Sequence, residues 1–232
     1  MRNKINALSL FSGGGIAETY FEEIGIHVKI ANELIPDRAE FYQHTHPNTE
    51  MICGDISLKE IFDDVISKAK ANNVKFLLAT PPCQGMSTLG KKQYETDARN
   101  SLIKYVLEAI DGLSPDYVMI ENVPKFVELL YDQDGSTYYS DTAVSKIPFH
   151  IIDLLKHLYS DEYNVDMKIL NAMNYSVPQS RPRVIIKMYK KGLEWPWPKE
   201  DEHIITLREA IGDLPSLEAG ESSNIKWHTA LN

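Results

Sequence analysis

The stretch ALSLFSGGG, residues 7–15, decides the fold of this chain of 232 residues. An apolar run leads into Phe11, and three consecutive glycines follow Ser12. This pattern predicts a buried strand that ends in a tight turn, because glycine permits backbone conformations that other residues resist. A strand, a glycine turn and a following helix form the unit with which doubly wound α/β sheets bind nucleotides.

Apolar runs of strand length alternate with segments of helical period along the rest of the chain. The alternation predicts an α/β fold, with a mostly parallel twisted sheet and helices on both faces. Strands are expected at residues 7–11, 28–32, 51–53, 76–79, 117–120, 163–170 and 184–188. Helices are expected at residues 16–24, 36–44 and 57–71. The last of these helices has Ser57 as its expected N-cap, with Glu60 three residues later.

The composition, 43% hydrophobic and 25% charged, is that of a globular chain able to bury a core. No apolar run approaches the ~20 residues that span a bilayer, so no membrane association is expected and the expected location is cytoplasmic, with the nucleoid in a prokaryote. Two cysteines in such a chain do not make a disulfide framework. We interpret Cys53 as a small buried hydrophobe.

The net charge of −9 argues against nucleic acid as a ligand, because Lys and Arg normally supply phosphate contacts. The local distribution of charge matters more than its total. Basic residues do occur in or beside the motifs described next: Lys91, Lys92, Arg99, Arg181 and Arg183. The objection is therefore weakened but not removed.

Three successive strand ends offer polar contacts for a nucleotide-like ligand. The glycine turn follows the first strand, Glu33 ends the second, and Asp55 follows the third. An acidic residue at the end of the second strand is placed to bond ribose hydroxyls, and Asp55 could meet an adenine amino group. A glycine turn alone can be no more than a turn, and this one lacks the last glycine of the Gly-x-Gly-x-x-Gly run of nicotinamide-dependent oxidoreductases.

The run PPCQ, residues 81–84, brings a thiol to the same edge of the predicted sheet. Its two prolines stiffen the backbone, so Cys83 is expected to point in one direction. A buried structural cysteine is the alternative, but we interpret Cys83 as a nucleophile.

Two further motifs contribute charged groups. The run ENV, residues 121–123, carries Glu121 out of an apolar strand, where a carboxyl group is a candidate for proton donation. The run QSRPR, residues 179–183, holds Arg181 and Arg183, which would share a face if both lay on a strand.

Two polar segments interrupt the alternation. Residues 85–100 are predicted to form a long loop of the kind that often closes over a site. Residues 131–145 are expected to be an exposed insertion. The run WPWP, residues 195–198, breaks regular structure and is typical of a linker.

In order and spacing, these motifs together resemble the DNA (cytosine-5)-methyltransferase family over nearly the whole chain. LFSGGG (10–15) resembles the family's cofactor turn, PCQ (82–84) its nucleophile motif, and ENV (121–123) its acid motif. The Q-x-R-x-R pattern (179–183) resembles the eighth motif, and D-x-R-x-x-L (97–102) resembles the short motif between nucleophile and acid. Ser9, Ile16 and Leu34 depart from the residues common in the family.

The resemblance implies a Rossmann-like methyltransferase fold, with S-adenosylmethionine as cofactor, S-adenosylhomocysteine as product and no metal. The implied catalytic residues are Cys83, Glu121, Arg181 and Arg183. The implied cofactor contacts are Phe11, Ser12, Gly13, Gly15, Glu33, Leu34, Asp55, Ile56, Pro82 and Leu102. The implied contacts with DNA and the loop are Gln84, Ser87, Arg99 and Gln179.

In the mechanism that the resemblance implies, Cys83 adds to C6 of a cytosine that is flipped out of duplex DNA. Glu121 would bond the ring at N3 and the exocyclic amine, and Arg183 would contact O2 with Arg181 in support. The closest alternative is a transfer-RNA cytosine-5 methyltransferase. A non-catalytic regulatory homologue is a second alternative.

Family members continue past the eighth motif into a target recognition domain and two further motifs, which are not evident here. Residues 1–190 are therefore expected to form the catalytic domain, and residues 191–232 a linker with a short helix near 206–214. The chain is expected to be one subunit of a split enzyme or a truncated part of a longer one, with a partner polypeptide that carries the missing parts, and its expected setting is a restriction-modification system.

Overall fold

The computed structural model describes residues 4–82, 101–136, 148–225 and 229. The chain divides into two compact units. The first comprises residues 1–169 and 183–196, and the second comprises residues 170–182 and 197–232.

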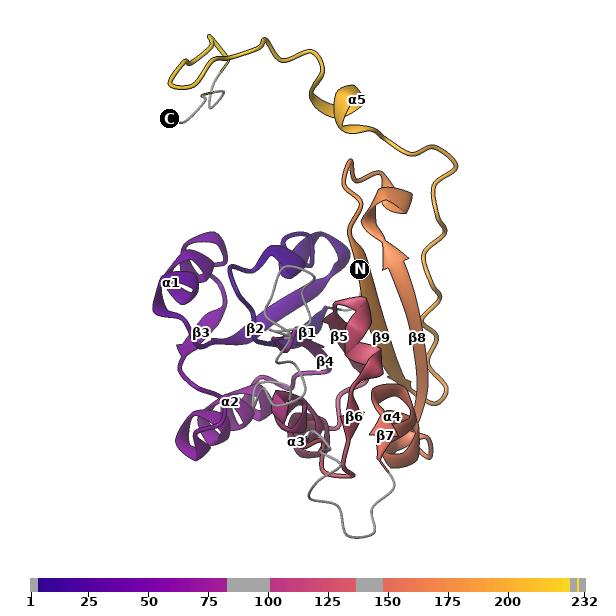
Figure 1. Ribbon diagram of the computed structural model, residues 1–232. Helices are drawn as coiled ribbons and strands as arrows, with labels where there is room; N and C mark the ends of the chain where they lie inside the picture. Colours follow the sequence, from indigo (N-terminus) through magenta and orange to yellow (C-terminus); the bar gives the residue numbers. More distant parts are fainter. Residues whose placement is uncertain (1–3, 83–100, 137–147, 226–228, 230–232) are drawn as a thin grey trace. The chain divides into compact units, whose positions relative to one another are not determined.

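A seven-stranded sheet organises the chain, with strand order β3-β2-β1-β4-β5-β9-β8 (Figure 1). Its strands are β1 (Ile5–Leu10), β2 (Ile26–Glu33), β3 (Glu50–Cys53), β4 (Phe76–Ala79), β5 (Tyr117–Asn122), β8 (Tyr163–Asn171) and β9 (Pro182–Lys190). The five strands from β3 to β5 in this order are parallel neighbours, whereas β9 pairs antiparallel with β5. The predicted mostly parallel sheet is confirmed.

Helices lie on both faces of this sheet, as the sequence predicts. They are α1 (Pro36–Thr45), α2 (Lys59–Ala71), α3 (Ile103–Leu113) and α4 (Ile151–Tyr159). Figure 1 shows α1 on one face and α2 and α3 on the other. A short ribbon of β6 (Leu130–Tyr131) and β7 (Phe149–His150) precedes α4, and the 3-10 helix η4 (Pro124–Glu128) follows β5.

The two faces of the sheet form separate hydrophobic cores because successive strand residues point to opposite sides. Leu8 and Leu10 belong to the core that α2, α3 and α4 cover. Ala7 belongs to the other core, together with Tyr42 of α1 and Phe76. A strand with both faces buried is apolar almost throughout, which is why the run at 7–10 is such a clear strand signal.

Two local predictions are wrong. Residues 16–24 were expected to be one helix, but they form two 3-10 helices, η1 (Ile16–Glu18) and η2 (Glu22–Ile24). Ser57 does not cap α2, since the helix begins two residues later. The backbone N–H of Ser57 bonds the Asp55 carboxylate at 2.8 Å.

The predicted exposed insertion is also wrong at its start. Tyr131 is fully buried, and its ring lies 6.1 Å from that of Phe126. A tyrosine ring offers too much apolar area to be left in water when a core is adjacent, so the exposed part begins after it. Residues 137–147 of this segment lie outside the described residues.

The second unit holds two short helices. The 3-10 helix η6 (Ala172–Tyr175) has Asn171 as its N-cap, and α5 (Leu207–Ile211) is closed by a capping box between Thr206 and Glu209. Helix α5 lies within the segment 191–232, for which a linker and a short helix were expected. Among the described residues of the whole chain, no helix has the length and apolar character needed to cross a membrane.

Candidate functional site

The candidate site lies at the carboxyl edge of the parallel strands, where α/β sheets of this kind bind ligands. Because β1, β2, β3, β4 and β5 run in one direction, the residues that end them meet at this edge. The glycine turn follows β1, Glu33 ends β2, Asp55 follows β3, and Glu121 lies near the end of β5.

The turn after β1 is held in an unusual backbone conformation. Phe11, Gly13 and Gly15 all have positive φ, at 60°, 57° and 76°. Two of these positions are glycines, which tolerate such angles, whereas Phe11 adopts a strained angle. The Ser12 N–H donates to the Asn32 carbonyl at 3.0 Å, and the Ser12 hydroxyl reaches the Ser9 carbonyl at 3.1 Å. These bonds fix the turn between β1 and β2.

Glu33 connects this turn to the next element. Its buried carboxylate accepts from the Gly13 N–H at 2.8 Å and from the Ile35 N–H at 2.9 Å. A Cβ added at Gly13 would meet no atom of the described residues within 4 Å, so among these residues the backbone there is open to a ligand. An acidic group beside an accessible glycine turn fits a cofactor that carries a ribose.

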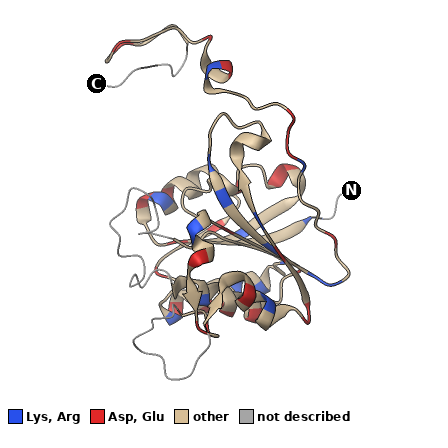
Figure 2. Ribbon diagram, turned by 45° about the vertical axis from the view of Figure 1, so that its right-hand side comes forward, with Lys and Arg blue, Asp and Glu red and all other residues tan. Residues whose placement is uncertain are grey.

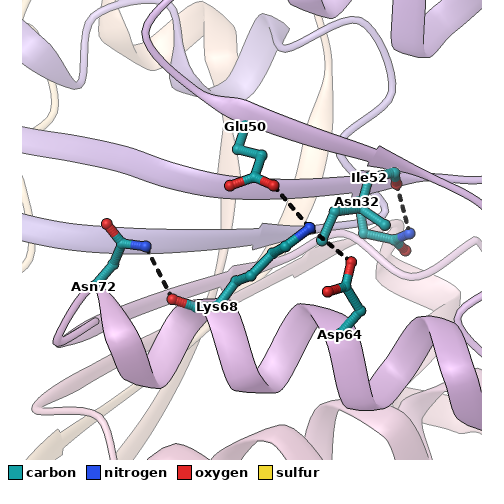
Figure 3. A network of polar contacts seen from close by, with 6 residues as sticks. All are labelled: Asn32, Glu50, Ile52, Asp64, Lys68 and Asn72. Carbon is teal, nitrogen blue, oxygen red and sulfur yellow. Dashed lines mark hydrogen bonds and ion pairs between the residues drawn. The ribbon is translucent and has the colours of Figure 1, made fainter.

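The end of β3 is held by Asn32 (Figure 3). Its side-chain amide donates to the carbonyls of Ile52 at 2.9 Å and Gly54 at 3.1 Å. Figure 3 also shows Lys68 of α2 between two carboxylates, at 2.7 Å from Glu50 and 2.8 Å from Asp64. These contacts position the turn that carries Asp55.

The remaining predicted cofactor contacts of this unit differ in exposure. Ile56 is buried, Asp55, Pro82 and Leu102 are half-buried, and Leu34 is exposed. An exposed apolar residue beside Glu33 is what a stacking contact with an adenine ring would require.

Asn122 links the strand that bears Glu121 to the start of the nucleophile motif. Its side chain, 4% exposed, donates to the Pro81 carbonyl at 2.9 Å and accepts from the Val123 N–H at 2.8 Å. Thr80 ties the same segment to the cofactor turn through a 2.8 Å bond to the Phe11 carbonyl. The sequence reasoning missed the positional role of Asn122, although a polar residue ending an apolar strand was the available signal.

Glu121 forms an ion pair with Arg183 of β9. Nε of Arg183 lies 3.0 Å from Oε1 of Glu121, and both side chains are about a quarter exposed. The antiparallel register explains the contact, since Glu121 is opposite Ile185, two residues from Arg183. The guanidinium therefore orients the carboxylate at the edge of the sheet.

Other predicted residues cannot be placed in this arrangement. Cys83, Gln84, Ser87 and Arg99 lie outside the described residues. Gln179 and Arg181 belong to the second unit, where both are exposed and the Arg181 N–H donates to the Asn171 side chain at 2.8 Å. Residue 181 precedes β9, so the expectation that both arginines share a strand face stays a prediction.

The interpretation of Cys53 as a buried residue is wrong. Cys53 is exposed, because it ends the edge strand β3, and its sulfur lies 3.9 Å from the Leu34 carbonyl.

Basic and acidic residues are interspersed along the helices, as the blue and red segments of the ribbon show (Figure 2). Within the part of the chain that the structure describes, no group of three or more His, Cys, Asp or Glu side chains is arranged to hold a metal ion.

Comparison with known proteins identifies relatives of one family. A profile for C-5 cytosine-specific DNA methylases matches residues 5–231. The Type II methyltransferase M1.HgaI of Avibacterium volantium is 41% identical over 98% of this chain and 62% of its own length. The Type II methyltransferase M1.HphI of Haemophilus parahaemolyticus is 29% identical over 97% of this chain and 57% of its own length. The chain thus spans about three fifths of these two relatives.

Solved structures support the same fold. A prophage-encoded E. coli protein described as a DNA modification methyltransferase has a TM-score of 0.68 at 22% identity, covering 94% of this chain and 57% of that one. A variant of DNMT2 from Spodoptera frugiperda has a TM-score of 0.58 at 24% identity, covering 87% of this chain and 54% of that one.

Proposed function

The chain belongs to the C-5 cytosine-specific DNA methylase family, and on that premise we propose that it methylates C5 of cytosine in duplex DNA. The observation that carries the proposal is the Glu121–Arg183 pair, which Asn122 ties to the segment that leads into Cys83. The carboxyl group of Glu121 and the guanidinium of Arg183 thus lie together at this edge of the sheet, which supports the proposal.

S-adenosylmethionine is the proposed cofactor, and when bound it supplies an electrophilic methyl group. The glycine turn and Glu33 would hold the nucleoside of the cofactor. Asp55 would bond the adenine base, and Leu34 and Ile56 would pack against the adenine ring. Phe11, Pro82 and Leu102 would complete the pocket. The accessible backbone at Gly13 supports this assignment, since a side chain there would occupy the space that the ligand needs.

Cys83 is the proposed nucleophile. Cytosine C5 reacts poorly with a methyl donor until the ring is activated, and adding a thiolate to C6 shifts electron density to C5. The C6–sulfur bond would form first, and C5 would then take the methyl group as the S–CH3 bond of the donor breaks and leaves S-adenosylhomocysteine. A base then removes the C5 proton, and the electron pair of that C–H bond restores the ring double bond as the thiolate leaves.

Glu121 and Arg183 would stabilise the ring during this sequence. A carboxyl group at N3 and the exocyclic amine stabilises the charge that thiolate addition creates, and a guanidinium at O2 fixes the ring plane. Because C5 is unreachable inside a duplex, the base must first be flipped out. Gln84, Ser87 and Arg99, together with Gln179 and Arg181, are proposed to contact the DNA or the closing loop.

We further propose that DNA readout requires residues beyond these 232, in a longer chain or a second polypeptide. The chain corresponds to 62% of the length of M1.HgaI, so more than a third of that relative has no counterpart here. The net charge of −9 supports the same proposal, because a surface that grips phosphates needs additional Lys and Arg.

Transfer of a labelled methyl group tests the function. The chain is mixed with a second polypeptide that consists of the residues of M1.HgaI without a match in this chain. Duplex DNA or transfer RNA is then added as substrate. We expect label in DNA, none with Cys83→Ser, and ordinary transfer with the matched control Cys53→Ser, whose exposed thiol has no proposed role in the reaction. Label in RNA alone would establish the transfer-RNA alternative. Full activity of the chain without the second polypeptide would refute the partner requirement.

A further inference from the structure

A buried carboxyl group, that of Glu18, connects the two ends of the turn at residues 11–15. Glu18 of η1 is 2% exposed, and its Oε1 accepts a short hydrogen bond from the hydroxyl of Ser9 in β1. Ser9 precedes the turn at 11–15 and Glu18 follows it. The bond therefore joins the strand that enters the turn to the helix that leaves it.

The surroundings of Glu18 disfavour a charge. Its second oxygen, Oε2, is buried and has no hydrogen-bond partner among the described residues. Burial raises the pKa of the Glu18 carboxyl, and the Ser9 bond offsets this only in part. A buried carboxylate without a cation is costly, so the neutral acid is the form that the folded turn favours.

Among the described residues, no ion pair with Lys, Arg or His compensates a charge on Glu18. Tyr42 of α1 faces it, and the pKa of this phenol is raised by burial and, second, by the Glu18 carboxyl. The Tyr42 ring is stacked on His46, with centroids 4.5 Å apart. These two rings also border Gly15, where an added Cβ would come within 2.5 Å of His46. Gly15 of the turn therefore lies close against His46.

We propose that Glu18 is a positioning residue for cofactor binding, which together with Ser9 holds the 11–15 turn in its binding conformation. The proposal rests on the proposed function, because it assigns this turn to S-adenosylmethionine. It also accounts for a departure from the family pattern. An aspartate at position 9, common in the family, would face Glu18 with a second carboxyl group, whereas the Ser9 hydroxyl donates to it.

The effect on the turn follows from its hydrogen bonds. The backbone of Glu18 already bonds Gly15 at 3.3 Å, and Gly15 bonds Ser12 at 3.0 Å. Without the Ser9–Glu18 bond, η1 can move away from β1, and the Gly13 and Gly15 amides are then held only by their bonds to Glu33 and Ser12. A ligand must then reorder the turn when it binds, which weakens its affinity.

Calorimetry with S-adenosylhomocysteine tests the inference on the complete chain. We expect Glu18→Ala to bind at least about tenfold more weakly than wild type, and the neutral isostere Glu18→Gln to stay within about twofold. Glu23→Gln, an exposed carboxylate of η2, is the matched control and should bind as wild type does. Wild-type affinity in Glu18→Ala would overturn the proposal.

The pH dependence gives a readout that a purely structural role would not move. Because the folded pKa of Glu18 is raised, ionising it opposes the closed turn as pH rises above the ordinary value of 4.5. The ratio of wild-type to Glu18→Gln affinity should therefore fall as the pH rises above 4.5. A constant ratio would count against the proposal, even if Glu18→Ala failed to fold.

Failure of the proposed function is distinguishable from failure of this inference. A wild-type chain that binds no S-adenosylhomocysteine would refute the cofactor assignment for the chain. Amide hydrogen exchange in the unliganded chain then decides the role of Glu18. Exchange at Gly13 and Gly15 at least about tenfold faster in Glu18→Ala supports the positioning role, and unchanged exchange overturns it.

Discussion

Replacing Asn122 with alanine tests the tie between the acid strand and the nucleophile segment. The substitution removes a donor to the Pro81 carbonyl at 2.9 Å and an acceptor for the Val123 N–H at 2.8 Å. At a site that is 4% exposed, water does not replace either partner readily. A fully buried abandoned group costs about 1–3 kcal/mol and the partly buried Val123 N–H about 1 kcal/mol, so the free energy of unfolding should fall by about 2–4 kcal/mol.

A loss of this size is a large part of the ~5–15 kcal/mol by which domains are stable. For a chain of this length it lowers the midpoint of thermal unfolding by about 4–16 °C. Urea and thermal unfolding of the two proteins measure it directly. Asn48→Ala, an exposed asparagine, is the matched control and should change the free energy of unfolding by less than about 0.5 kcal/mol.

Asn122→Asp separates the two bonds. It keeps the acceptor for the Val123 N–H but points a carboxylate oxygen at the Pro81 carbonyl, where the native amide donates. We expect this variant to remain folded while the Pro81 segment loosens. The rate of the reaction at Cys83 should therefore fall by a larger factor than the equilibrium constant for folding does. An Asn122→Ala variant as stable as the Asn48→Ala control would refute the reasoning.

Three further predictions concern the turn, the ion pair and an alkaline transition. Gly15→Ala should lower the unfolding free energy by more than Gly13→Ala, because both have positive φ but only residue 15 meets His46, at 2.5 Å; equal losses by urea unfolding would be inconsistent with this. Arg183→Lys should slow methyl transfer by at least about tenfold, since lysine lacks the planar guanidinium fork, and should leave S-adenosylhomocysteine affinity within about twofold. An unchanged rate of methyl transfer in the presence of the second polypeptide would contradict the proposed role. The pKa of Tyr159 is raised by burial and a nearby carboxylate, so wild type should lose stability relative to Tyr159→Phe as pH rises above 10, by about 1.4 kcal/mol per pH unit. Parallel stability curves above that pH would exclude the effect.

The sequence predicted the sheet well because its strands are buried on both faces. Strand β4 occupies the predicted residues, and the other strands differ by a few residues at their ends. Doubly buried strands give long apolar runs, and the glycines and acidic residues that follow them mark their carboxyl ends. Glu33 and Glu121 could therefore be assigned to one edge of the sheet from the sequence.

The failures occur where tertiary contacts override local pattern. The segment 16–24 looked helical, but Glu18 turns inward to bond Ser9, and the helix is reduced to two short turns. Cys53 looked buried because cysteines usually are, yet it ends an edge strand. Neither outcome can be predicted from residue spacing. The inward turn of Glu18 depends on which strand lies beside η1, and the exposure of Cys53 depends on which strand lies at the edge of the sheet.

Covalent trapping of a duplex that contains 5-fluorocytosine tests the central claim most directly. Fluorine at C5 cannot leave as a proton does, so a methylated ring stays bonded to the nucleophile. With S-adenosylmethionine and the complementing polypeptide present, we predict an adduct that survives denaturation and maps to the peptide containing Cys83. The adduct should form equally with Cys53→Ser and be absent with Cys83→Ser. An adduct that persists in Cys83→Ser, or none in a wild-type complex that binds both DNA and cofactor, would contradict the account.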